Sequence, residues 1–155
     1  MTILINQRVP DFTATATSGK DISFAALRGW NVVIYFYPKD DTPGCTLESQ
    51  AFGNRYDQFK AAQTLVFGVS RDSLKSHEKF KCKYNLPFEL ISDDSEALCR
   101  LFNVIKMKNM YGKQVKGIER STFLIDKNGD LRKVWRAVKV DGHVDEVLSA
   151  AKTLP

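Results

Sequence analysis

The sequence contains few of the residues that build metal sites, cofactor sites or disulfide frameworks. Its 155 residues include two histidines and three cysteines, and an odd number of cysteines argues against a set of structural disulfides. No C-x-x-C pair occurs, and His77 and Cys82 do not have the spacing of zinc ligands. The chain also lacks the glycine-rich motifs that hold nucleotide phosphates. These absences leave reactive or buried thiols as the interpretations of the cysteines.

Long hydrophobic stretches are absent as well. No segment reaches the roughly 20 apolar residues of a membrane helix, and the first ten residues lack the basic start and apolar run of a secretory signal. We therefore expect no membrane association and a cytoplasmic location. Hydrophobic residues make up 43% of the chain and charged residues 26%, which is the composition of a globular protein. The length predicts a single domain that spans residues 1–155.

Hydrophobic patterning predicts alternating strands and helices. The expected strands are Asn31 to Tyr37, Leu65 to Ser70, Glu89 to Ser92, Ser121 to Ile125 and Leu131 to Val140. The expected helices are Cys45 to Ala62, Ser73 to Tyr84, Glu96 to Phe102 and His143 to Lys152. Turn residues predict one hairpin within Phe12 to Phe24, at Ser18-Gly19, and another at Asn128-Gly129. This order predicts an α/β protein with a thioredoxin-like fold: a central mixed β-sheet flanked by helices, with an N-terminal β-hairpin.

The first cysteine lies where a buried strand gives way to a helix. Thr42 is a favoured N-cap residue and Pro43 suits the first helical position, which places Cys45 near the third position of the first turn. An ordinary thiol is only about 3% ionised at pH 7, and lowering its pKa from about 8.5 to about 6 takes roughly 3.4 kcal/mol. A helix N-terminus supplies about 0.3–1 kcal/mol, or ~2 kcal/mol in a favourable buried site. A reactive thiolate here therefore needs a nearby cation, and the alternative is a small buried hydrophobic residue.

The residues around Cys45 resemble those of a known family. The pattern Pro38-x-x-x-Thr42-x-x-Cys45 is similar to the active-site motif of peroxiredoxins. The longer stretch YFYPKDDTPGCTLES resembles the peroxiredoxin Q, or bacterioferritin comigratory protein, subfamily, and the similarity continues through VFGVSRDS, LPFELISD and GIERSTFLID. The resemblance covers nearly the whole chain. It implies a thioredoxin-like fold and a thiol-dependent peroxidase activity.

The resemblance also implies a role for each matching residue. Cys45 would be the peroxidatic cysteine, whose thiolate attacks the terminal peroxide oxygen and becomes a sulfenic acid. Thr42 would offer its hydroxyl to the thiolate or the peroxide, and Pro38 would shield the pocket from water. Arg120 would supply the fixed cation beside the thiolate, and Glu48 would pair with Arg120 and orient it. This chemistry needs no metal and no organic cofactor.

Two further cysteines are candidates to resolve the sulfenic acid. Some members of the subfamily carry a second cysteine five residues after the first, but this chain has Gln50 there. Helical periodicity places Cys82 on a lysine-rich polar face and Cys99 beside an apolar face, as a half-buried structural thiol. The resemblance also places the resolving cysteine on the helix of Cys82. We therefore expect an intramolecular Cys45–Cys82 disulfide, formed after local unwinding; in the alternative, Cys82 is idle and an external thiol resolves Cys45.

The implied substrates are hydrogen peroxide and organic hydroperoxides. The implied reductant is a dithiol protein, thioredoxin or glutaredoxin, of which the resemblance favours thioredoxin, and the expected oligomeric state is a monomer. An alternative of a different class is a peroxide sensor or chaperone-like redox protein that uses the same cysteine. A net charge of +5 and the lysine-rich stretch IKMKNMYGKQVKGIER would also suit a nucleic-acid-binding module. That interpretation leaves Cys45 unexplained, so we expect no nucleic acid partner and a solvated loop over Ile105 to Arg120.

Overall fold

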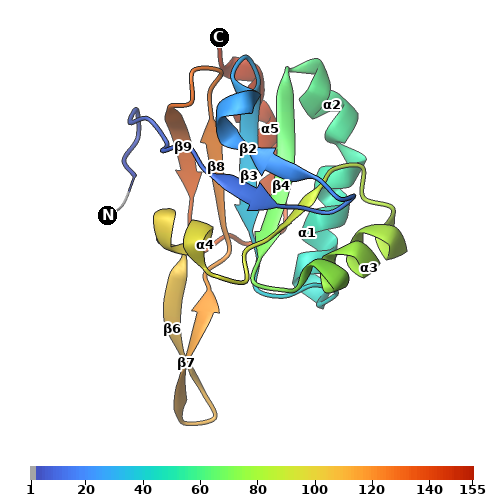
Figure 1. Cartoon of the computed structure of the whole chain (residues 1–155), viewed down its shortest axis with the longest axis vertical. Coiled ribbons are helices and arrows are strands. Elements are labelled where there is room, and N and C mark those ends of the chain that lie inside the picture. Colours follow the sequence, from blue (N-terminus) through green and yellow to red (C-terminus); the bar gives the residue numbers. More distant parts are fainter. Residues whose placement is uncertain (1–2) are drawn as a thin grey trace.

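A five-stranded mixed sheet forms the centre of the protein. The computed structural model describes residues 3–155, and its central sheet has the strand order β5-β4-β3-β8-β9 (Figure 1). The strands are β3 (Asn31–Phe36), β4 (Thr64–Ser70), β5 (Leu90–Ser92), β8 (Ser121–Ile125) and β9 (Leu131–Trp135). β3, β4 and β5 run parallel, whereas β8 pairs antiparallel with both β3 and β9. The predicted mixed sheet is therefore confirmed.

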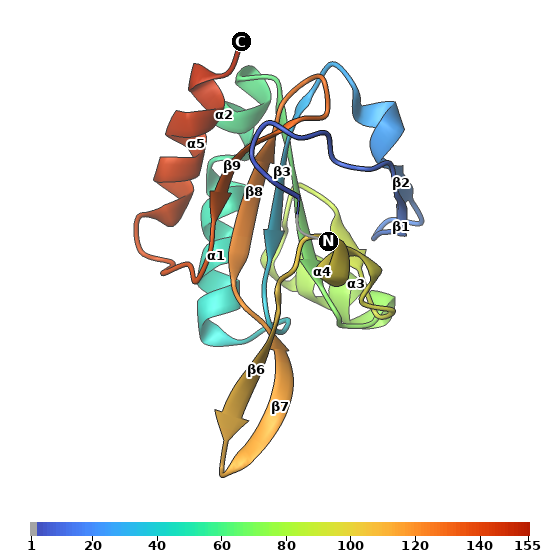
Figure 2. The ribbon, with the colours of Figure 1, turned by 90° about the vertical axis from the view of Figure 1, so that its left-hand side faces the viewer.

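Helices and a small hairpin cover the two faces of this sheet. The helices are α1 (Pro43–Asn54), α2 (Tyr56–Ala61), α3 (Leu74–Tyr84), α4 (Ala97–Leu101) and α5 (His143–Thr153). Figure 2 shows α1, α2 and α5 on one side of the sheet and α4 with the hairpin of β1 (Thr13–Thr15) and β2 (Asp21–Ser23) on the other. The short 3-10 helix Phe24–Leu27 follows β2.

The central strand β3 explains why the sequence is apolar on successive positions. Its side chains alternate between the two faces. Val33 and Tyr35 join the core beneath α1, α2 and α5, whereas Val32, Ile34 and Phe36 join the core beneath the hairpin and α4. Both layers are thus anchored on one strand, and the residues that follow β3 leave the sheet from a rigid, buried element.

Most predicted elements are present, and two end earlier than expected. The predicted helix Cys45 to Ala62 is two helices, because the backbone turns at Arg55 between α1 and α2; the preceding Gly53 and Asn54 are weak helix formers. The predicted strand Leu131 to Val140 ends at Trp135, and Ala137 has a positive φ of 48°, which a strand does not tolerate. The N-terminal hairpin turns as predicted at Ser18-Gly19.

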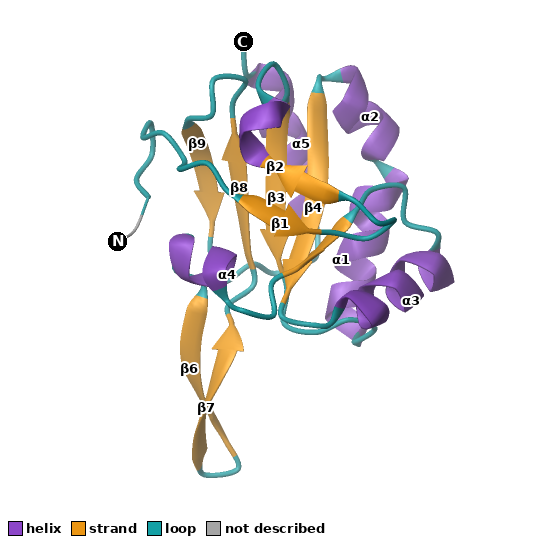
Figure 3. Ribbon diagram, in the orientation of Figure 1, coloured by secondary structure: helices purple, strands orange, loops and turns teal. Residues whose placement is uncertain are grey.

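The basic stretch expected to be a solvated loop is a β-hairpin, so that prediction was wrong. β6 (Ile105–Met110) and β7 (Lys113–Ile118) pair antiparallel, and Tyr111 and Gly112 make the turn with positive φ values of 54° and 76°. Figure 3 shows this hairpin projecting beyond the end of the central sheet. Both faces of its outer part are exposed. Ile105 and Met107 alternate with lysines, but this alternation is short and Met107 is exposed, so it does not mark a buried strand face. Among the described residues, no helix has the length and hydrophobicity needed to cross a membrane.

Candidate active site

Cys45 occupies the position that the sequence predicts. Thr42 is the N-cap of α1 and Pro43 its first residue, so Cys45 is the third residue of the first turn. The N–H groups of a first turn have no intrahelical acceptors and point toward solvent or a bound anion. The Thr42 side chain does not cap this helix; its Oγ1 donates to the carbonyl oxygen of Lys39 at 2.9 Å. Cys45 itself is only 1% exposed.

Arg120 lies beside Cys45 in the fold, although it follows Cys45 by 75 positions in the sequence. Ser121, the first residue of β8, lies opposite Phe36, the last residue of β3. Arg120 directly precedes β8, and the loop to Cys45 directly follows β3, so the antiparallel pairing brings the two segments together. The Nη2 atom of Arg120 lies 3.4 Å from Cys45 Sγ. This contact supplies the cation that an ionised thiol requires at this position.

Glu48 completes a buried cluster with these two residues. Its Oε1 accepts a hydrogen bond from Arg120 Nη1 at 2.7 Å, while Arg120 keeps Nη2 on the sulfur. The Glu48 side chain is fully buried, and that of Arg120 is 16% exposed. Burial raises the pKa of Glu48 to about 7, although the charge and the hydrogen bond of Arg120 act in the opposite direction. For Arg120, burial lowers the pKa, but Glu48 and Cys45 outweigh it and hold the guanidinium charged.

Two more of the predicted residues, Thr42 and Pro38, lie in the loop between β3 and α1. Both are partly buried. The Thr42 hydroxyl proton is engaged with Lys39 rather than with the sulfur. Four of the predicted site residues therefore share the β3–α1 loop and the first turns of α1, and Arg120 joins them through the β3–β8 pairing.

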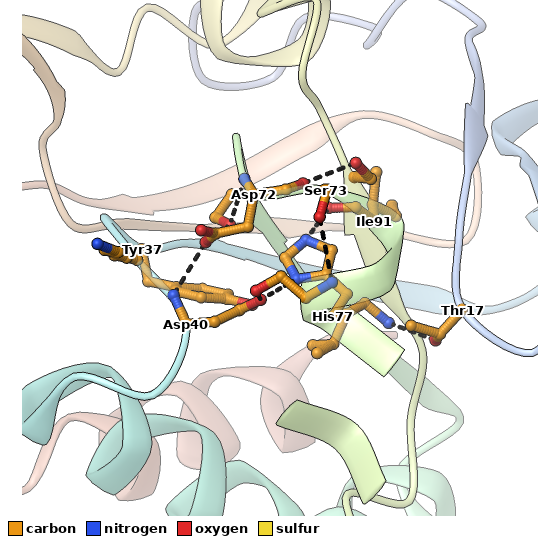
Figure 4. A network of polar contacts seen from close by, with 12 residues as sticks. Thr17, Tyr37, Asp40, Asp72, Ser73, His77 and Ile91 are labelled. Carbon is orange, nitrogen blue, oxygen red and sulfur yellow. Dashed lines mark hydrogen bonds and ion pairs between the residues drawn. The ribbon is translucent and has the colours of Figure 1, made fainter. Parts of the chain in front are cut away.

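A polar network behind this loop was not expected from the sequence. Figure 4 shows Asp40 and His77 pointing toward each other, with Nδ1 of His77 at 2.7 Å from Oδ2 of Asp40. The Asp40 carboxylate also accepts hydrogen bonds from the hydroxyls of Tyr37 at 2.6 Å and Ser76 at 2.8 Å. The other ring nitrogen of His77 lies 2.9 Å from the carbonyl oxygen of Ile91. The network fixes the first two turns of α3 to the ends of β3 and β5.

Asp72 extends the network, and with Asp40 and His77 it has the composition of a metal site. One ligand atom from each of the three residues lies within 4.8 Å of the others. The Oδ2 atom of Asp72 accepts hydrogen bonds from the backbone N–H of Asp40 and the hydroxyl of Ser70. The carboxylate of Asp40 and both ring nitrogens of His77 are occupied as described above. We therefore interpret the cluster as a structural network.

The remaining cysteines differ in exposure, and all three cysteines are free in this structure. Cys82 is exposed on α3, as predicted. Cys99 is fully buried rather than half-buried, and burial raises the pKa of its thiol far above the ordinary range. Asp93 accepts hydrogen bonds from the backbone N–H groups of Leu98 and Cys99 and so caps α4. A buried thiol in this environment is unreactive, so Cys99 has a packing role.

The last turn of α3 is tied to the loop that precedes Cys45. The carboxylate of Asp41 accepts a hydrogen bond from Tyr84 Oη at 2.6 Å and forms an ion pair with Lys83 Nζ at 2.7 Å. These two residues directly follow Cys82 in the same turn. The helix end that carries the exposed thiol therefore lies against the segment that leads to the buried one.

Comparison with known proteins identifies the family. Residues 5–134 match the AhpC/TSA family. The chain is 49% identical to "Putative peroxiredoxin bcp" of Coxiella burnetii over 96% of this chain and 98% of that protein. A solved structure of Xanthomonas campestris peroxiredoxin Q is 52% identical, has a TM-score of 0.88 and covers 91% of this chain and 89% of its own. A Xylella fastidiosa PrxQ mutant is 39% identical with a TM-score of 0.93, over 98% of this chain and 97% of its own.

These likenesses extend over almost the entire chain, and they agree with the fold. The sheet and helices described above are those of a thioredoxin-like peroxiredoxin. The chain therefore belongs to the AhpC/TSA family and is a peroxiredoxin of the Bcp, or Q, type.

Proposed function

We propose that this peroxiredoxin reduces hydrogen peroxide and alkyl hydroperoxides through Cys45, that Cys82 resolves the sulfenic acid, and that thioredoxin reduces the resulting disulfide. The observation that carries the proposal is the 3.4 Å contact between Arg120 Nη2 and Cys45 Sγ at the N-terminus of a helix. The alkyl peroxide substrate is supported by the Xanthomonas campestris relative, 51% identical, whose structures are described as insights into its alkyl peroxide reduction activity.

The first step is a nucleophilic displacement at oxygen. The Cys45 thiolate forms a bond to the terminal peroxide oxygen, and the O–O bond breaks. The sulfur loses two electrons and becomes a sulfenic acid, while the other oxygen leaves with the bonding pair and takes up a proton to give water or an alcohol. Arg120 and the free N–H groups of the first α1 turn are placed to stabilise the negative charge on both oxygens. The Thr42 hydroxyl would turn from Lys39 toward the peroxide in this step.

The second step joins Cys45 to Cys82 and releases water. A disulfide requires the two Cα atoms to be within about 7 Å, and the buried Cys45 has to leave its place beneath the first turn of α1. The first half of α3 is held by the buried Asp40–His77 network. The last turn is held to the loop by the exposed contacts of Asp41. We therefore place the movement in the first turn of α1 and the last turn of α3, with the His77 end of α3 fixed.

Recycling, oligomeric state and location complete the proposal. An exposed Cys82 leaves one sulfur of the disulfide accessible to an incoming dithiol protein. We propose thioredoxin in that role, a monomeric protein and a cytoplasmic location, where thiols are kept reduced.

Coupled turnover with peptide mapping tests the proposal. NADPH consumption with thioredoxin and its reductase is followed for the wild type, Cys45→Ser and Cys82→Ser, with either hydrogen peroxide or an alkyl hydroperoxide. Wild type is expected to turn over repeatedly and to give a Cys45–Cys82 peptide after one equivalent of peroxide. A single oxidation of wild type without recycling supports a sensor instead. A free Cys82 in the oxidised wild type, or an intramolecular disulfide in Cys82→Ser, would contradict the resolving role.

A further inference from the structure

The cluster at Cys45 contains two acidic groups, the Cys45 thiol and the Glu48 carboxyl, and one cation, the Arg120 guanidinium. Arg120 uses one nitrogen of its guanidinium for Cys45 Sγ and the other for Glu48 Oε1. Glu48 lies one turn after Cys45 on α1 and is 0% exposed. One partly buried cation therefore bridges two groups that can each carry a negative charge. With both groups ionised the cluster would hold an uncompensated negative charge, which is costly away from water.

The second oxygen of Glu48 favours the protonated form of this acid. Oε2 is buried, and no group among the described residues lies within hydrogen-bond reach of it. A carboxylate with one bare buried oxygen loses more solvation than a neutral carboxyl does. The rise of the pKa of Glu48 to about 7, caused by burial and only partly offset by Arg120, agrees with this geometry.

The neighbouring titratable groups leave the charge of the cluster unchanged. Tyr35 of β3 donates to Ser49 Oγ at 2.8 Å, and burial raises the pKa of this phenol well above its ordinary value. On α5, burial and then Arg120 lower the pKa of His143 to about 4. Both are neutral at pH 7, and Asp40 is paired with His77 in the neighbouring network. The described charges of the cluster are thus those of Cys45, Arg120 and Glu48.

We propose that Glu48 is a positioning residue that stores one proton: it is protonated while Cys45 is a thiolate and ionised once Cys45 is a sulfenic acid. The inference rests on the proposed role of Cys45. The atoms balance: thiolate, protonated Glu48 and hydroperoxide give sulfenic acid, ionised Glu48 and alcohol. The leaving oxygen takes its proton at the open side of the site, and Glu48 releases one. Before the reaction, the thiolate is therefore the only anion beside the Arg120 guanidinium. After the reaction, the ionised Glu48 is the anion that pairs with Arg120.

This exchange predicts the number of protons drawn from the medium. If Glu48 stays ionised throughout, each oxidation of a thiolate to a sulfenic acid takes up one proton. If Glu48 supplies the proton, the uptake approaches zero. The difference is measurable in weakly buffered solution with an indicator dye, after mixing reduced protein with one equivalent of hydrogen peroxide. A Cys82→Ser background stops the reaction at the sulfenic acid.

The decisive comparison is Glu48 against Glu48→Gln in that background at about pH 6.5. Glutamine keeps the shape and a hydrogen-bond acceptor for Arg120 but holds no exchangeable acid proton. We expect an uptake close to one proton for Glu48→Gln and a clearly smaller uptake for the Glu48 protein, because loss of the thiolate charge leaves Arg120 to Glu48 alone and favours its ionised form. Glu146→Gln, an exposed change on α5, is the matched control and should behave as the unchanged protein. Equal uptake by the Glu48→Gln variant and the Glu48 protein would overturn the proposal.

A second measurement needs no substitution at Glu48. In the infrared difference spectrum of oxidation, a carboxylic-acid C=O band should disappear and a carboxylate band should appear. A spectrum without this exchange overturns the proposal, even if Glu48→Gln does not fold. Trapping of the sulfenic acid with a 1,3-dione distinguishes a failure of the Glu48 role from a failure of the proposed function. An adduct on Cys45 with equal proton uptake refutes only the role of Glu48, whereas the absence of a Cys45 adduct refutes the proposed function as well.

Discussion

The guanidinium of Arg120 lies 3.4 Å from the sulfur of Cys45, although 75 positions of sequence separate the two residues. The contact depends on the antiparallel pairing of β3 and β8, which places Ser121 opposite Phe36. The backbone on either side of Arg120 is therefore fixed by the sheet, and Glu48 fixes the end of its side chain at 2.7 Å. Because both the backbone and the guanidinium of Arg120 are held in place, the side chain needs little reorganisation when charge develops on the peroxide.

Replacement of Arg120 should slow the oxidation of Cys45. A charge-assisted hydrogen bond contributes about 1.5–3 kcal/mol, which corresponds to roughly 10- to 150-fold in rate. We expect the second-order rate constant with hydrogen peroxide to fall by about this factor in Arg120→Met. Arg120→Lys should lose less, because lysine keeps the charge but lacks the two guanidinium nitrogens that contact Cys45 and Glu48 separately. Stopped-flow tryptophan fluorescence measures the rate. Lys139→Met, at an exposed position, is the control. If Arg120→Met is oxidised as fast as Lys139→Met, Arg120 does not assist the reaction of Cys45.

Gly44 offers a test that leaves the charged residues in place. A Cβ atom at Gly44 would lie 3.2 Å from Nη2 of Arg120. We expect Gly44→Ala to push the guanidinium away from Cys45 and to slow the first step several-fold. Thermal stability should change little, because Gly44 is the second residue of α1 and the helix-propensity difference of an interior position does not apply in full there. Loss of rate together with a large loss of stability would show that the substitution disturbs the fold instead.

Weakening the tie between the loop and the end of α3 should speed the second step. Asp41 has a positive φ of 57° and holds Lys83 and Tyr84. Asp41→Asn keeps a residue that tolerates this backbone conformation and removes the charge. Exposed ion pairs contribute about 0–1 kcal/mol, so we expect disulfide formation to accelerate up to several-fold, with sulfenic acid formation unchanged.

Quenched-flow mass analysis of the Cys45 and Cys82 peptides follows both steps. Asp57→Asn, on the exposed surface of α2, is the matched control. Slower disulfide formation in Asp41→Asn would mean that the tie guides the two cysteines together, contrary to our account.

Two buried groups should give the stability opposite pH dependences. The pKa of Glu48 is raised from 4.5 to about 7, so its contribution to stability is complete below pH 4.5 and is lost as the pH rises through 7. The pKa of His143 is lowered from 6.5 to about 4, so its contribution is complete above pH 6.5 and is lost as the pH falls through 4. Each effect is on the order of 3 kcal/mol, and the two offset each other between pH 4.5 and 6.5.

Single substitutions separate these contributions. Relative to wild type, the free energy of unfolding of Glu48→Gln should fall on acidification from pH 7 to 4.5. That of His143→Gln should rise over the same range. Urea unfolding at several pH values measures both slopes. Parallel curves for the wild type and either variant would contradict the assigned protonation of that residue.

Local patterns in the sequence predicted much of the fold and one side of the site. The buried strands and the start of α1 depend on neighbours in sequence, so the position of Cys45 behind Thr42 and Pro43 was correctly predicted. Arg120 could not be identified by spacing, because its place depends on the β3–β8 pairing, and only the family resemblance pointed to it.

The Asp40–His77 contact and the β6–β7 hairpin show why the remainder was missed. Asp40 follows a strand and resembles an ordinary turn residue, while His77 lies on the apolar face of α3; their pairing joins segments 37 positions apart. The hairpin has little buried surface, so the hydrophobic alternation in its sequence is limited to the short run Ile105 to Lys108.

The central claim is that the sulfur of Cys45 is the atom that peroxide oxidises. The most direct test mixes reduced protein with one equivalent of hydrogen peroxide, with no external reductant, and measures the remaining peroxide. We expect wild type and Cys82→Ser each to consume the equivalent rapidly, and Cys45→Ser to consume none above the rate in buffer. Peroxide consumption by Cys45→Ser at the wild-type rate would contradict the account.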